Sequence, residues 1–398
     1  MDAAGGMVPT CLTPISVSYD SHSVCRRAKM FRVINPFQVT KPVAPAEVID
    51  RDDETAQLVS LAEEGNNARL VAPRRYGKTS LLRRVQDSLD RAGWITVYVD
   101  LLGIVTLDDF AQRVERAYSD ALTGTVAKWF VGLRRSLRPA LTVGGGPVPA
   151  SATVDLGAER REALVARLAL PTRVFEKTGR RVHVVFDEFQ ELDAVGGQAD
   201  AVVRSEIQHH GDMASYVFAG SQLRMMEMLF ADRKRAFYGQ TERVLLQPLE
   251  AEPLAGYLAS RFDRTRKDMT EAALGALLDL VEGHPQRAMA AAHALWNAAD
   301  RIADLDEWEA ARSSLMMAVE DELKTAWVEL TATQRRVLLA VSLGSPPYQR
   351  SDGRSQGAAV TRALASLEGR GAITRVNGRW RVVDPLLAEW VRSGRPSA

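Results

Sequence analysis

The chain is short of cysteine, with only Cys11 and Cys25 in 398 residues. Two thiols are too few for a disulfide framework or a zinc site, so a reducing compartment is expected. The sequence also lacks an apolar run of the roughly 20 residues that a membrane-spanning helix needs, and its N-terminus lacks a basic segment followed by an apolar core. We therefore expect a cytoplasmic protein with no membrane partner.

An excess of charge of either sign is missing too. Lys and Arg number 51 against 50 Asp and Glu, which gives a formal net charge of +1. This balance argues against a polybasic nucleic-acid-binding protein as a whole, although a local basic face remains compatible with it. Hydrophobic residues make up 46% of the chain and charged residues 25%, as in ordinary globular proteins, and the length indicates two or three domains.

A phosphate-binding motif follows a short apolar strand at residues 68–71. Its spacing matches the Walker A loop, with Ala72 in place of the usual first glycine and Lys78 and Thr79 at the end. Backbone N–H groups would cradle the phosphates, Lys78 would neutralise the β and γ oxygens, and the Thr79 hydroxyl would bind Mg²⁺. The expected cofactors are ATP and Mg²⁺. The candidate nucleotide-binding residues here are Ala72, Pro73, Arg74, Arg75, Tyr76, Gly77, Lys78, Thr79 and Ser80.

A second acidic motif argues against a chance match of the first. Residues 181–186 are rich in β-branched and apolar side chains, and Asp187 and Glu188 follow them. This pattern predicts a Walker B strand, in which Asp187 holds the Mg²⁺ hydration shell and Glu188 polarises the attacking water. The alternative is an acidic strand end that faces solvent. A further buried strand at residues 215–221 ends in Ser221, which either senses the γ-phosphate or serves simple turn chemistry.

The rest of the chain alternates strands with helices. A capped helix is expected within residues 48–64, a strand at residues 94–101 and a helical lid after residue 250, so the sheet should be parallel. Residues 1–29 have no pattern and are expected to be disordered, with Met30 as the native start. Residues 139–156 suggest a hairpin or a mobile insertion, and no role is assigned to it.

The two Walker motifs, residues 220–221 and residues 283–287 together resemble the AAA+ ATPases of the archaeal-type and STAND group. Residues 35–37 near the start and residues 384–387 near the end add to the resemblance, which covers about residues 34–392. It implies an α/β fold: a P-loop NTPase core with a five-stranded parallel sheet, a helical lid and a C-terminal winged helix. The expected domains are residues 30–250, 251–325 and 326–398.

The lid motif contains a helix break at Pro285, beside which Arg287 would reach the γ-phosphate. In related ATPases the matching arginine acts as sensor 2; the alternative is an arginine on a helix surface. The chain departs from the family where relatives often carry an arginine directly after a glycine, because Gln240 follows Gly239. Arg235 and Arg243 remain alternatives for an arginine finger. Because arginine is missing at the usual position, a slow, switch-like ATPase is expected.

Basic residues gather near the C-terminus. Residues 331–398 contain eleven arginines, no lysine and four acidic residues, a charge of about +7 that leaves about −6 for the rest. A helix, a second helix at residues 358–370 and a hairpin with an Asn-Gly turn predict the winged helix. Either this unit binds duplex DNA or it packs against protein. The candidate DNA contacts are Thr361, Arg362, Arg370, Arg375, Arg379 and Arg381.

Three functions fit these motifs. The first is a Mg²⁺-dependent, ATP-hydrolysing switch that couples its nucleotide state to a partner through the winged helix. The second is a DNA-binding replication or transposition helper that resembles origin-recognition ATPases. The third is a scaffold that binds ATP without hydrolysis, which the intact pair of Asp187 and Glu188 disfavours. A protein partner or a homo-oligomer is expected, but the motifs do not identify it.

Overall fold

A computed structural model describes residues 34–136, 156–196, 199–348, 354–376 and 378–394. Residues 35–398 belong to one structural unit. The predicted tail, residues 1–29, lies outside the described residues, as does the predicted insertion apart from its last residue, Leu156. Among the described residues, no helix is both long and apolar enough to cross a membrane.

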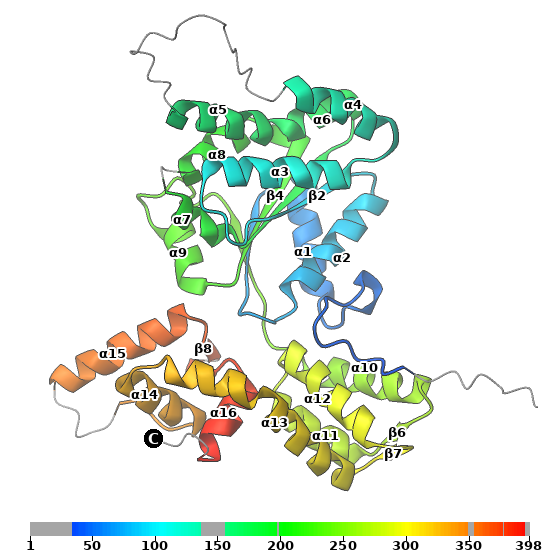
Figure 1. Ribbon diagram of the computed structural model, residues 1–398, viewed down its shortest axis with the longest axis vertical. Helices are drawn as coiled ribbons and strands as arrows, with labels where there is room; N and C mark the ends of the chain where they lie inside the picture. Colours follow the sequence, from blue (N-terminus) through cyan, green and yellow to red (C-terminus); the bar gives the residue numbers. More distant parts are fainter. Residues whose placement is uncertain (1–33, 137–155, 197–198, 349–353, 377, 395–398) are drawn as a thin grey trace, which may run out of the picture. The chain divides into compact units, whose positions relative to one another are not determined.

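Five parallel strands form the central sheet, as the sequence predicts. Their spatial order is β2-β3-β4-β1-β5, and Figure 1 shows the sheet between its helices. The strands are β1 (Ala68–Val71), β2 (Ile95–Asp100), β3 (Val182–Asp187), β4 (Ala214–Gly220) and β5 (Glu242–Leu245). Every residue of β3 and β4 is buried. Because all five strands run in the same direction, Val71, Asp187 and Gly220 end at the same edge of the sheet.

Helices cover both faces of the sheet. The apolar face of α1 (Asp52–Glu63) and α2 (Lys78–Arg91) packs on one face, around Leu70, Val185 and Val217. The other face is covered by α3 (Leu107–Ala121), α4 (Gly124–Ser136), α5 (Leu156–Leu168), α6 (Leu170–Thr178), α7 (Leu192–Val195), α8 (Ala199–Ile207) and α9 (Leu223–Ala231). Three short 3-10 helices, η1 (Pro45–Glu47), η2 (Phe189–Glu191) and η3 (Gly211–Met213), join these elements.

An aromatic cluster anchors the turn that follows β3. Phe189, the first residue of η2, lies with its ring centroid 4.6 Å from that of Phe218 on β4 and 5.3 Å from that of Phe237. Phe186 and Phe230 complete the cluster. Because aromatic pairs add to the stability that burial provides, this packing fixes the backbone on either side of Glu188.

Helix α1 is present where the sequence predicts it, but the expected side-chain cap is not made. Its N-cap residue is Arg51, which is buried and donates to the backbone oxygen of Gln247. The neighbouring Asp50 has φ 51° and accepts from the backbone N–H of Glu250. The side chains that could cap the helix therefore make tertiary contacts instead. The N-terminus of α1 is stabilised by the acidic residues of its first turn, which interact favourably with the helix dipole.

The remaining elements are mainly helical. They are α10 (Ala251–Arg264), α11 (Glu271–Val281), α12 (Pro285–Ala298), α13 (Leu305–Val328), α14 (Ala332–Ser342), α15 (Arg354–Gly369) and α16 (Pro385–Arg392). Strands β6 (Asp268–Met269) and β7 (Ile302–Ala303) form a small parallel pair, and β8 (Ile373–Val376) and β9 (Arg379–Val382) form an antiparallel hairpin. One continuous apolar cluster joins the elements from α10 to α16. The predicted domain boundary at residue 325 falls inside α13, a single helix of 24 residues.

The first described residues pack on the helical part of the chain rather than on the sheet. The Asn35 amide donates to the backbone oxygen of His293, at 3.1 Å, and to the side chain of Asn297, at 3.0 Å. Phe37 is buried, with its ring centroid 5.5 Å from that of Phe262. These contacts bring the start of the described chain onto α10 and α12.

Candidate nucleotide-binding site

The loop of residues 72–77 connects β1 to α2 at the edge of the sheet where the strands end. Arg75, at φ 68°, and Gly77, at φ 84°, lie in the left-handed region, and Gly77 is the N-cap of α2. The loop thus ends at the positive end of α2, a place suited to binding phosphate. Ala72 is buried in the core beside β1, so its methyl group packs where the usual glycine would leave a gap.

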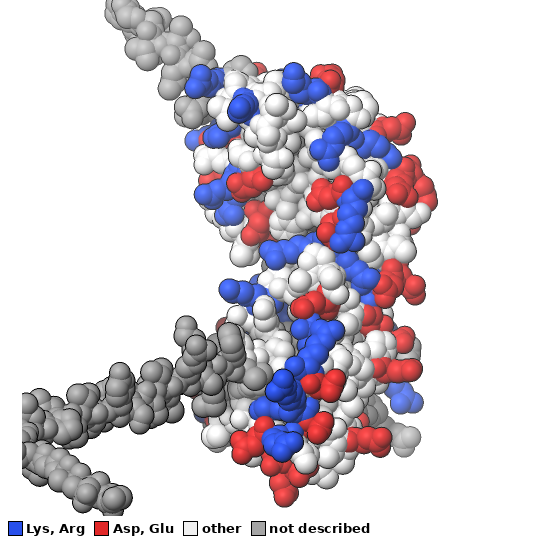
Figure 2. All heavy atoms as spheres, turned by 90° about the vertical axis from the view of Figure 1, so that its right-hand side faces the viewer, with Lys and Arg blue, Asp and Glu red and all other residues white. Residues whose placement is uncertain are grey.

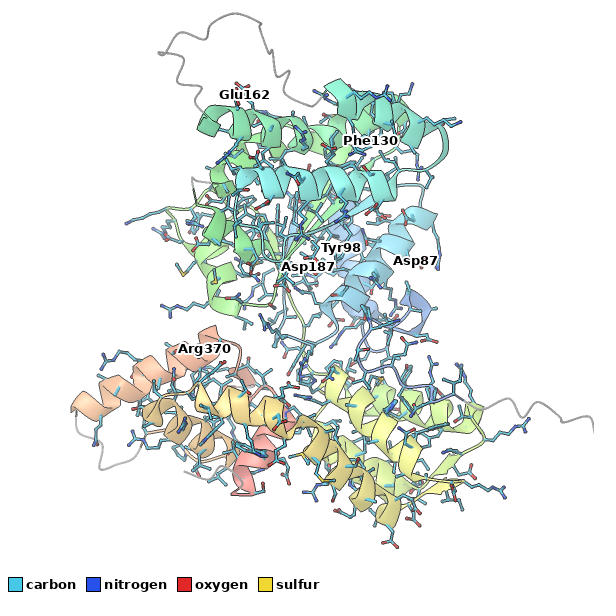
Figure 3. The ribbon with its side chains drawn as sticks, in the orientation of Figure 1. Asp87, Tyr98, Phe130, Glu162, Asp187 and Arg370 are labelled. Atoms are coloured by element: carbon cyan, nitrogen blue, oxygen red, sulfur yellow. The ribbon has the colours of Figure 1, made fainter. Side chains whose placement is uncertain are left out.

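Lys78 lies between the two predicted acidic residues. Its Nζ is 2.5 Å from Oδ1 of Asp187 and 2.8 Å from Oε1 of Glu188. The side chains of Lys78 and Asp187 are each 9% exposed, so the ion pair is shielded from solvent. Figure 3 shows Asp187 at the end of the sheet, near the start of α2. The structure therefore brings the lysine of the first motif and the carboxylates of the second into direct contact.

Glu188 is held by three further features. Ser221 Oγ donates to its Oε2 at 2.8 Å, Gln190 Nε2 donates to the same oxygen at 2.5 Å, and the backbone of Glu188 has φ 52°. Burial would raise the pKa of Glu188, but the Lys78 ammonium and these hydrogen bonds outweigh it and lower that pKa. Glu188 is therefore an ionised carboxylate, as a group that polarises water must be.

Asp187 is the best placed carboxylate for a metal ion beside the loop. Besides Lys78, it receives hydrogen bonds from the backbone N–H of Glu188, at 2.9 Å, and from the hydroxyl of Tyr98. The Thr79 side chain interacts with the same Tyr98 hydroxyl. These hard oxygen groups fit Mg²⁺. No set of three or more metal-ligating residues gathers in the described ranges. An ion here would thus take further ligands from nucleotide phosphates and water, which Mg²⁺ usually does.

The helical part of the chain meets the loop at the start of α12. His284 is the N-cap of α12 and Pro285 its first residue, and the ring of His284 lies edge-on to that of Tyr76, with centroids 4.9 Å apart. Arg75 forms an ion pair with Glu322 of α13. Of the remaining candidate residues, Pro73 in the loop and Ser80 in α2 are buried, and Arg74 is exposed. The predicted lid motif therefore contacts the loop through the aromatic pair, and α13 contacts it through the ion pair.

Arg287, the predicted sensor arginine, is engaged by carboxylates. Its side chain is 1% exposed, its Nε lies 3.0 Å from Oδ1 of Asp384, and its Nη2 lies 3.0 Å from Oε1 of Glu322. Burial would raise the pKa of Asp384, but hydrogen bonding and charge from Arg287 outweigh it and lower that pKa. Asp384 also accepts from the backbone N–H of Leu386 as the cap of α16. Arg287 thus links α12 to the start of the last helix.

The candidate DNA contacts are spread over α15 and the hairpin. Thr361, Arg362, Arg370, Arg375 and Arg379 are exposed. Arg375 lies over the ring of Trp380, 4.3 Å from its centroid. Arg381 differs from the others, because its Nε lies 2.6 Å from Oε2 of Glu282 at the end of α11. On the face drawn in Figure 2, Lys and Arg mix with Asp and Glu over most of the surface.

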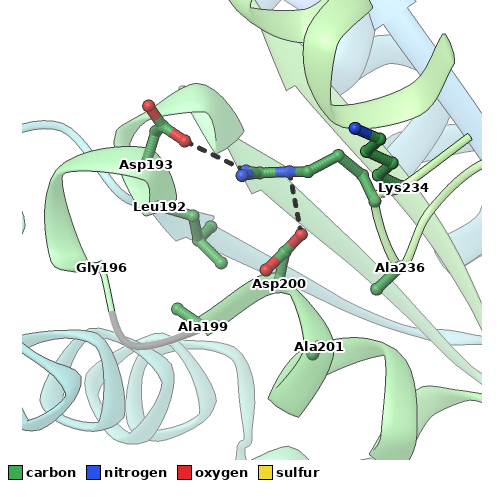
Figure 4. Close-up of a pocket in the computed structure, with 9 residues that line it drawn as sticks. Leu192, Asp193, Gly196, Ala199, Asp200, Ala201, Lys234 and Ala236 are labelled. Carbon is green, nitrogen blue, oxygen red and sulfur yellow. Dashed lines mark hydrogen bonds and ion pairs between the residues drawn. The ribbon is translucent and has the colours of Figure 1, made fainter. Parts of the chain in front are cut away.

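The two alternatives for an arginine finger are both paired. Arg235 contacts Asp193 and Asp200, at 3.0 and 3.1 Å, in a pocket of about 460 Å³ shown in Figure 4. Arg243 lies 3.8 Å from Glu227. Gln240, at the position where relatives often have arginine, accepts from Arg204 at 2.6 Å. None of the residues that line this pocket belongs to the 72–77 loop.

Sequence reasoning missed Tyr98 and Gln190 as parts of the site. Gln190 lies two residues after Glu188, and this spacing was the only signal for it. Tyr98 lies on β2, where strict alternation places it on the α2 face together with Thr96 and Asp100. A polar aromatic residue on that face, near the end of a strand, was the available signal.

Solved structures supply the comparison with known proteins. The Walker-type ATPase paby2304 of Pyrococcus abyssi matches with a TM-score of 0.65 and 17% identity, over 89% of this chain and 99% of that one. The ORC2 protein of Aeropyrum pernix matches with TM-scores of 0.56 in its ADPNP-ADP complexes, at 13% identity, and 0.53 in its ADP form, at 14%. These two matches cover 93% and 90% of this chain, and 99% and 97% of the other. No protein-family model and no curated protein matches. The chain has the fold of the AAA+ P-loop ATPases.

Proposed function

We propose that the protein is a Mg²⁺-dependent ATPase that acts as a switch of the AAA+/STAND type. The observation that carries this proposal is the contact of Lys78 with Asp187 and Glu188 at the edge of the parallel sheet. Lys78 would exchange the carboxylates for the β and γ oxygens of ATP, which leaves both carboxylates free for their own roles. Mg²⁺ would be held by Thr79, Asp187 and the phosphates, and it would neutralise charge on the transferred phosphoryl group.

Glu188 is the proposed general base. It is ionised and lies beside Ser221, which is proposed to report on the γ-phosphate. Lys78 donates to Oε1 of Glu188, and Gln190 and Ser221 donate to Oε2. Because Lys78 donates to Oε1, it would have to move to the nucleotide before that oxygen can take a proton from water. This requirement favours slow turnover.

The proposed switch links the nucleotide to the C-terminal helices through Arg287. Its partners are Asp384 at the start of α16 and Glu322 on α13, and Glu322 also pairs with Arg75 of the loop. A γ-phosphate that attracts Arg287 competes with these two carboxylates for the same guanidinium. Nucleotide binding would thereby loosen α16 from α12. A lid over residues 251–325 and a winged helix over residues 326–398 would be the moving parts.

Calorimetry with ATP and MgCl₂ on the full chain tests nucleotide binding. Wild type should bind, and Lys78→Ala should lose at least tenfold in affinity because its charge-assisted hydrogen bonds to phosphate are gone. Lys177→Ala, on the exposed surface of α6, is the matched control and should bind as wild type does. Phosphate release then separates an ATPase from a scaffold, since a scaffold would bind ATP and release none. An absence of binding by wild type would end the proposal.

DNA binding is the second candidate function, as a helper ATPase that resembles origin-recognition proteins. It is favoured by the exposed arginines of this region, which are Arg362 on α15, Arg370 directly after α15, and Arg375 and Arg379 on the β8–β9 hairpin. Such residues would contact phosphates, so binding to duplex DNA should weaken steeply as salt rises. Fluorescence anisotropy at low and physiological salt measures this. No binding at low salt would leave the C-terminal helices as a protein-interaction unit, within a monomer or a homo-oligomer.

A further inference from the structure

Tyr98 touches the candidate metal-binding carboxylate from the side opposite Lys78. Its hydroxyl donates to Oδ2 of Asp187, whereas Lys78 and the backbone N–H of Glu188 donate to Oδ1. The two oxygens of Asp187 are therefore held by different donors. Figure 3 shows Tyr98 and Asp187 next to each other in the sheet.

The backbone explains why a tyrosine at this position reaches the site. Strand β2 pairs in parallel with β3, and Tyr98 is in register with Val185, two residues before Asp187. On β2 the apolar residues Val97 and Val99 face α3, so Tyr98 faces α2, the helix that starts with Lys78 and Thr79. The length of the phenol side chain spans the two residues of strand that separate it from the carboxylate.

The environment keeps the hydroxyl a donor. Burial, and then the negative charge of Asp187, raise the pKa of Tyr98 well above its ordinary value, although the Thr79 side chain acts in the opposite direction. A phenol carries its proton at physiological pH in any case, so the hydrogen-bond geometry itself makes Tyr98 a donor to Asp187. When Lys78 turns to a nucleotide, the Tyr98 hydroxyl remains as a side-chain hydrogen bond on Asp187.

We propose that Tyr98 is a positioning residue of the Mg²⁺ site, whose hydroxyl fixes the orientation of the Asp187 carboxylate beside Thr79. The inference rests on the proposed function, since it concerns the same site. A carboxylate that is already oriented loses less conformational freedom when it binds the ion or its water. Tyr98 acts through Asp187 and does not touch the reacting atoms, so its effect should appear in the dependence on metal.

Binding measurements on the full chain test this role. A non-hydrolysable ATP analogue is titrated in EDTA and then at increasing Mg²⁺, and Mn²⁺ binding to the protein with that analogue is followed by electron paramagnetic resonance. For Tyr98→Phe we expect unchanged affinity in EDTA and an increase of about tenfold in the half-saturating Mg²⁺ and Mn²⁺ concentrations, as lost partners of metal ligands usually cause.

Tyr216→Phe is the matched control. Tyr216 is a buried tyrosine of the same sheet, and its hydroxyl bonds to His210 instead of an acidic residue. Its loss should lower the melting temperature without a change in metal dependence. If Tyr98→Phe does not fold, 4-aminophenylalanine at position 98, which restores an N–H donor, should keep the wild-type metal dependence.

Three results decide the matter. A Mg²⁺ midpoint of a folded Tyr98→Phe within twofold of wild type would overturn the role of Tyr98. An equal shift in Tyr216→Phe would also overturn it, because any buried hydroxyl of the sheet would then have the same effect. A wild-type protein that binds no analogue even with Mg²⁺ would instead overturn the proposed function, and this result is visible before any variant is compared.

Discussion

Arg287 and Asp384 are 97 residues apart in the sequence, yet Nε of the arginine lies 3.0 Å from Oδ1 of the aspartate. The pair joins the first turn of α12 to the cap of α16. A buried arginine must be paired, so the carboxylate and any bound phosphate compete for it.

Removing the charge of Asp384 should therefore strengthen nucleotide binding. In Asp384→Asn the amide still caps α16, but its attraction for Arg287 is lost, and we expect ATP affinity to rise about tenfold. The free energy of unfolding should fall by about 1–3 kcal/mol because Arg287 keeps only Glu322. Glu389→Gln, in the second turn of α16, weakens the pair with Arg312 of α13, so it should cost stability and leave ATP affinity unchanged. Equal affinities in all three proteins would refute the competition.

Glu188→Gln should separate binding from hydrolysis. Glutamine has nearly the same shape and still accepts the hydrogen bond from Ser221, so ATP should bind, but it cannot take a proton from water. We expect phosphate release to fall by about 100-fold or more. The control is Glu191→Gln in the next turn, whose carboxylate makes no contact with Lys78. Hydrolysis by Glu188→Gln at the wild-type rate would remove Glu188 from the chemistry.

Gly220 should tolerate no side chain. A Cβ at this position would lie 2.4 Å from Oε1 of Gln190 and 2.5 Å from Sδ of Met226. We expect Gly220→Ala to destabilise the fold by about 1–3 kcal/mol through overpacking. It should also slow hydrolysis more than it weakens ATP binding, because a displaced Gln190 no longer orients the Glu188 carboxylate. Gly256→Ala in α10, where a Cβ meets no atom within 4 Å, provides the control for chemical denaturation. A fully stable, active Gly220→Ala would contradict this packing.

Stability should fall as the solution becomes acidic. Burial lowers the pKa of His183, His210 and His284 from 6.5 to about 4, so below pH 6.5 the unfolded chain takes up protons that the folded chain does not. The loss begins near pH 6.5 and levels off near pH 4, with a slope of about 1.4 kcal/mol per pH unit for each histidine. Urea denaturation between pH 7 and 4.5 measures it. His210→Gln should reduce the slope by about a third, and a flat profile would disprove the assignment.

The sheet and its order of elements could be predicted because the signals are local. Residues 182–187 do not alternate between polar and apolar side chains and are buried throughout, as a central parallel strand requires. The phosphate loop is recognised from the spacing of its residues within positions 72–79. The closeness of Lys78 and Asp187 could be predicted in the same way. Lys78 follows β1 and Asp187 ends β3, and parallel strands of one sheet end at the same edge.

The ion pairs could not be predicted. Arg287 was expected to face a phosphate and Arg381 to face DNA, but nothing in the neighbouring sequence reveals Asp384 or Glu282 as their partners. Pairs of this kind depend on how helices far apart in the chain pack together, which periodicity does not encode. The missing cap of α1 has the same cause. Asp50 accepts a hydrogen bond from the backbone N–H of Glu250, which is 200 residues away in the sequence.

The contacts of Asn35 form late when the chain folds during its synthesis. During synthesis, His293 leaves the ribosome 258 residues after its partner Asn35. At roughly 5–20 residues per second, the delay is roughly ten to fifty seconds. The last strand of the sheet ends at Leu245, before α10 and α12 begin, so Phe37 stays uncovered on the nascent chain until those helices follow.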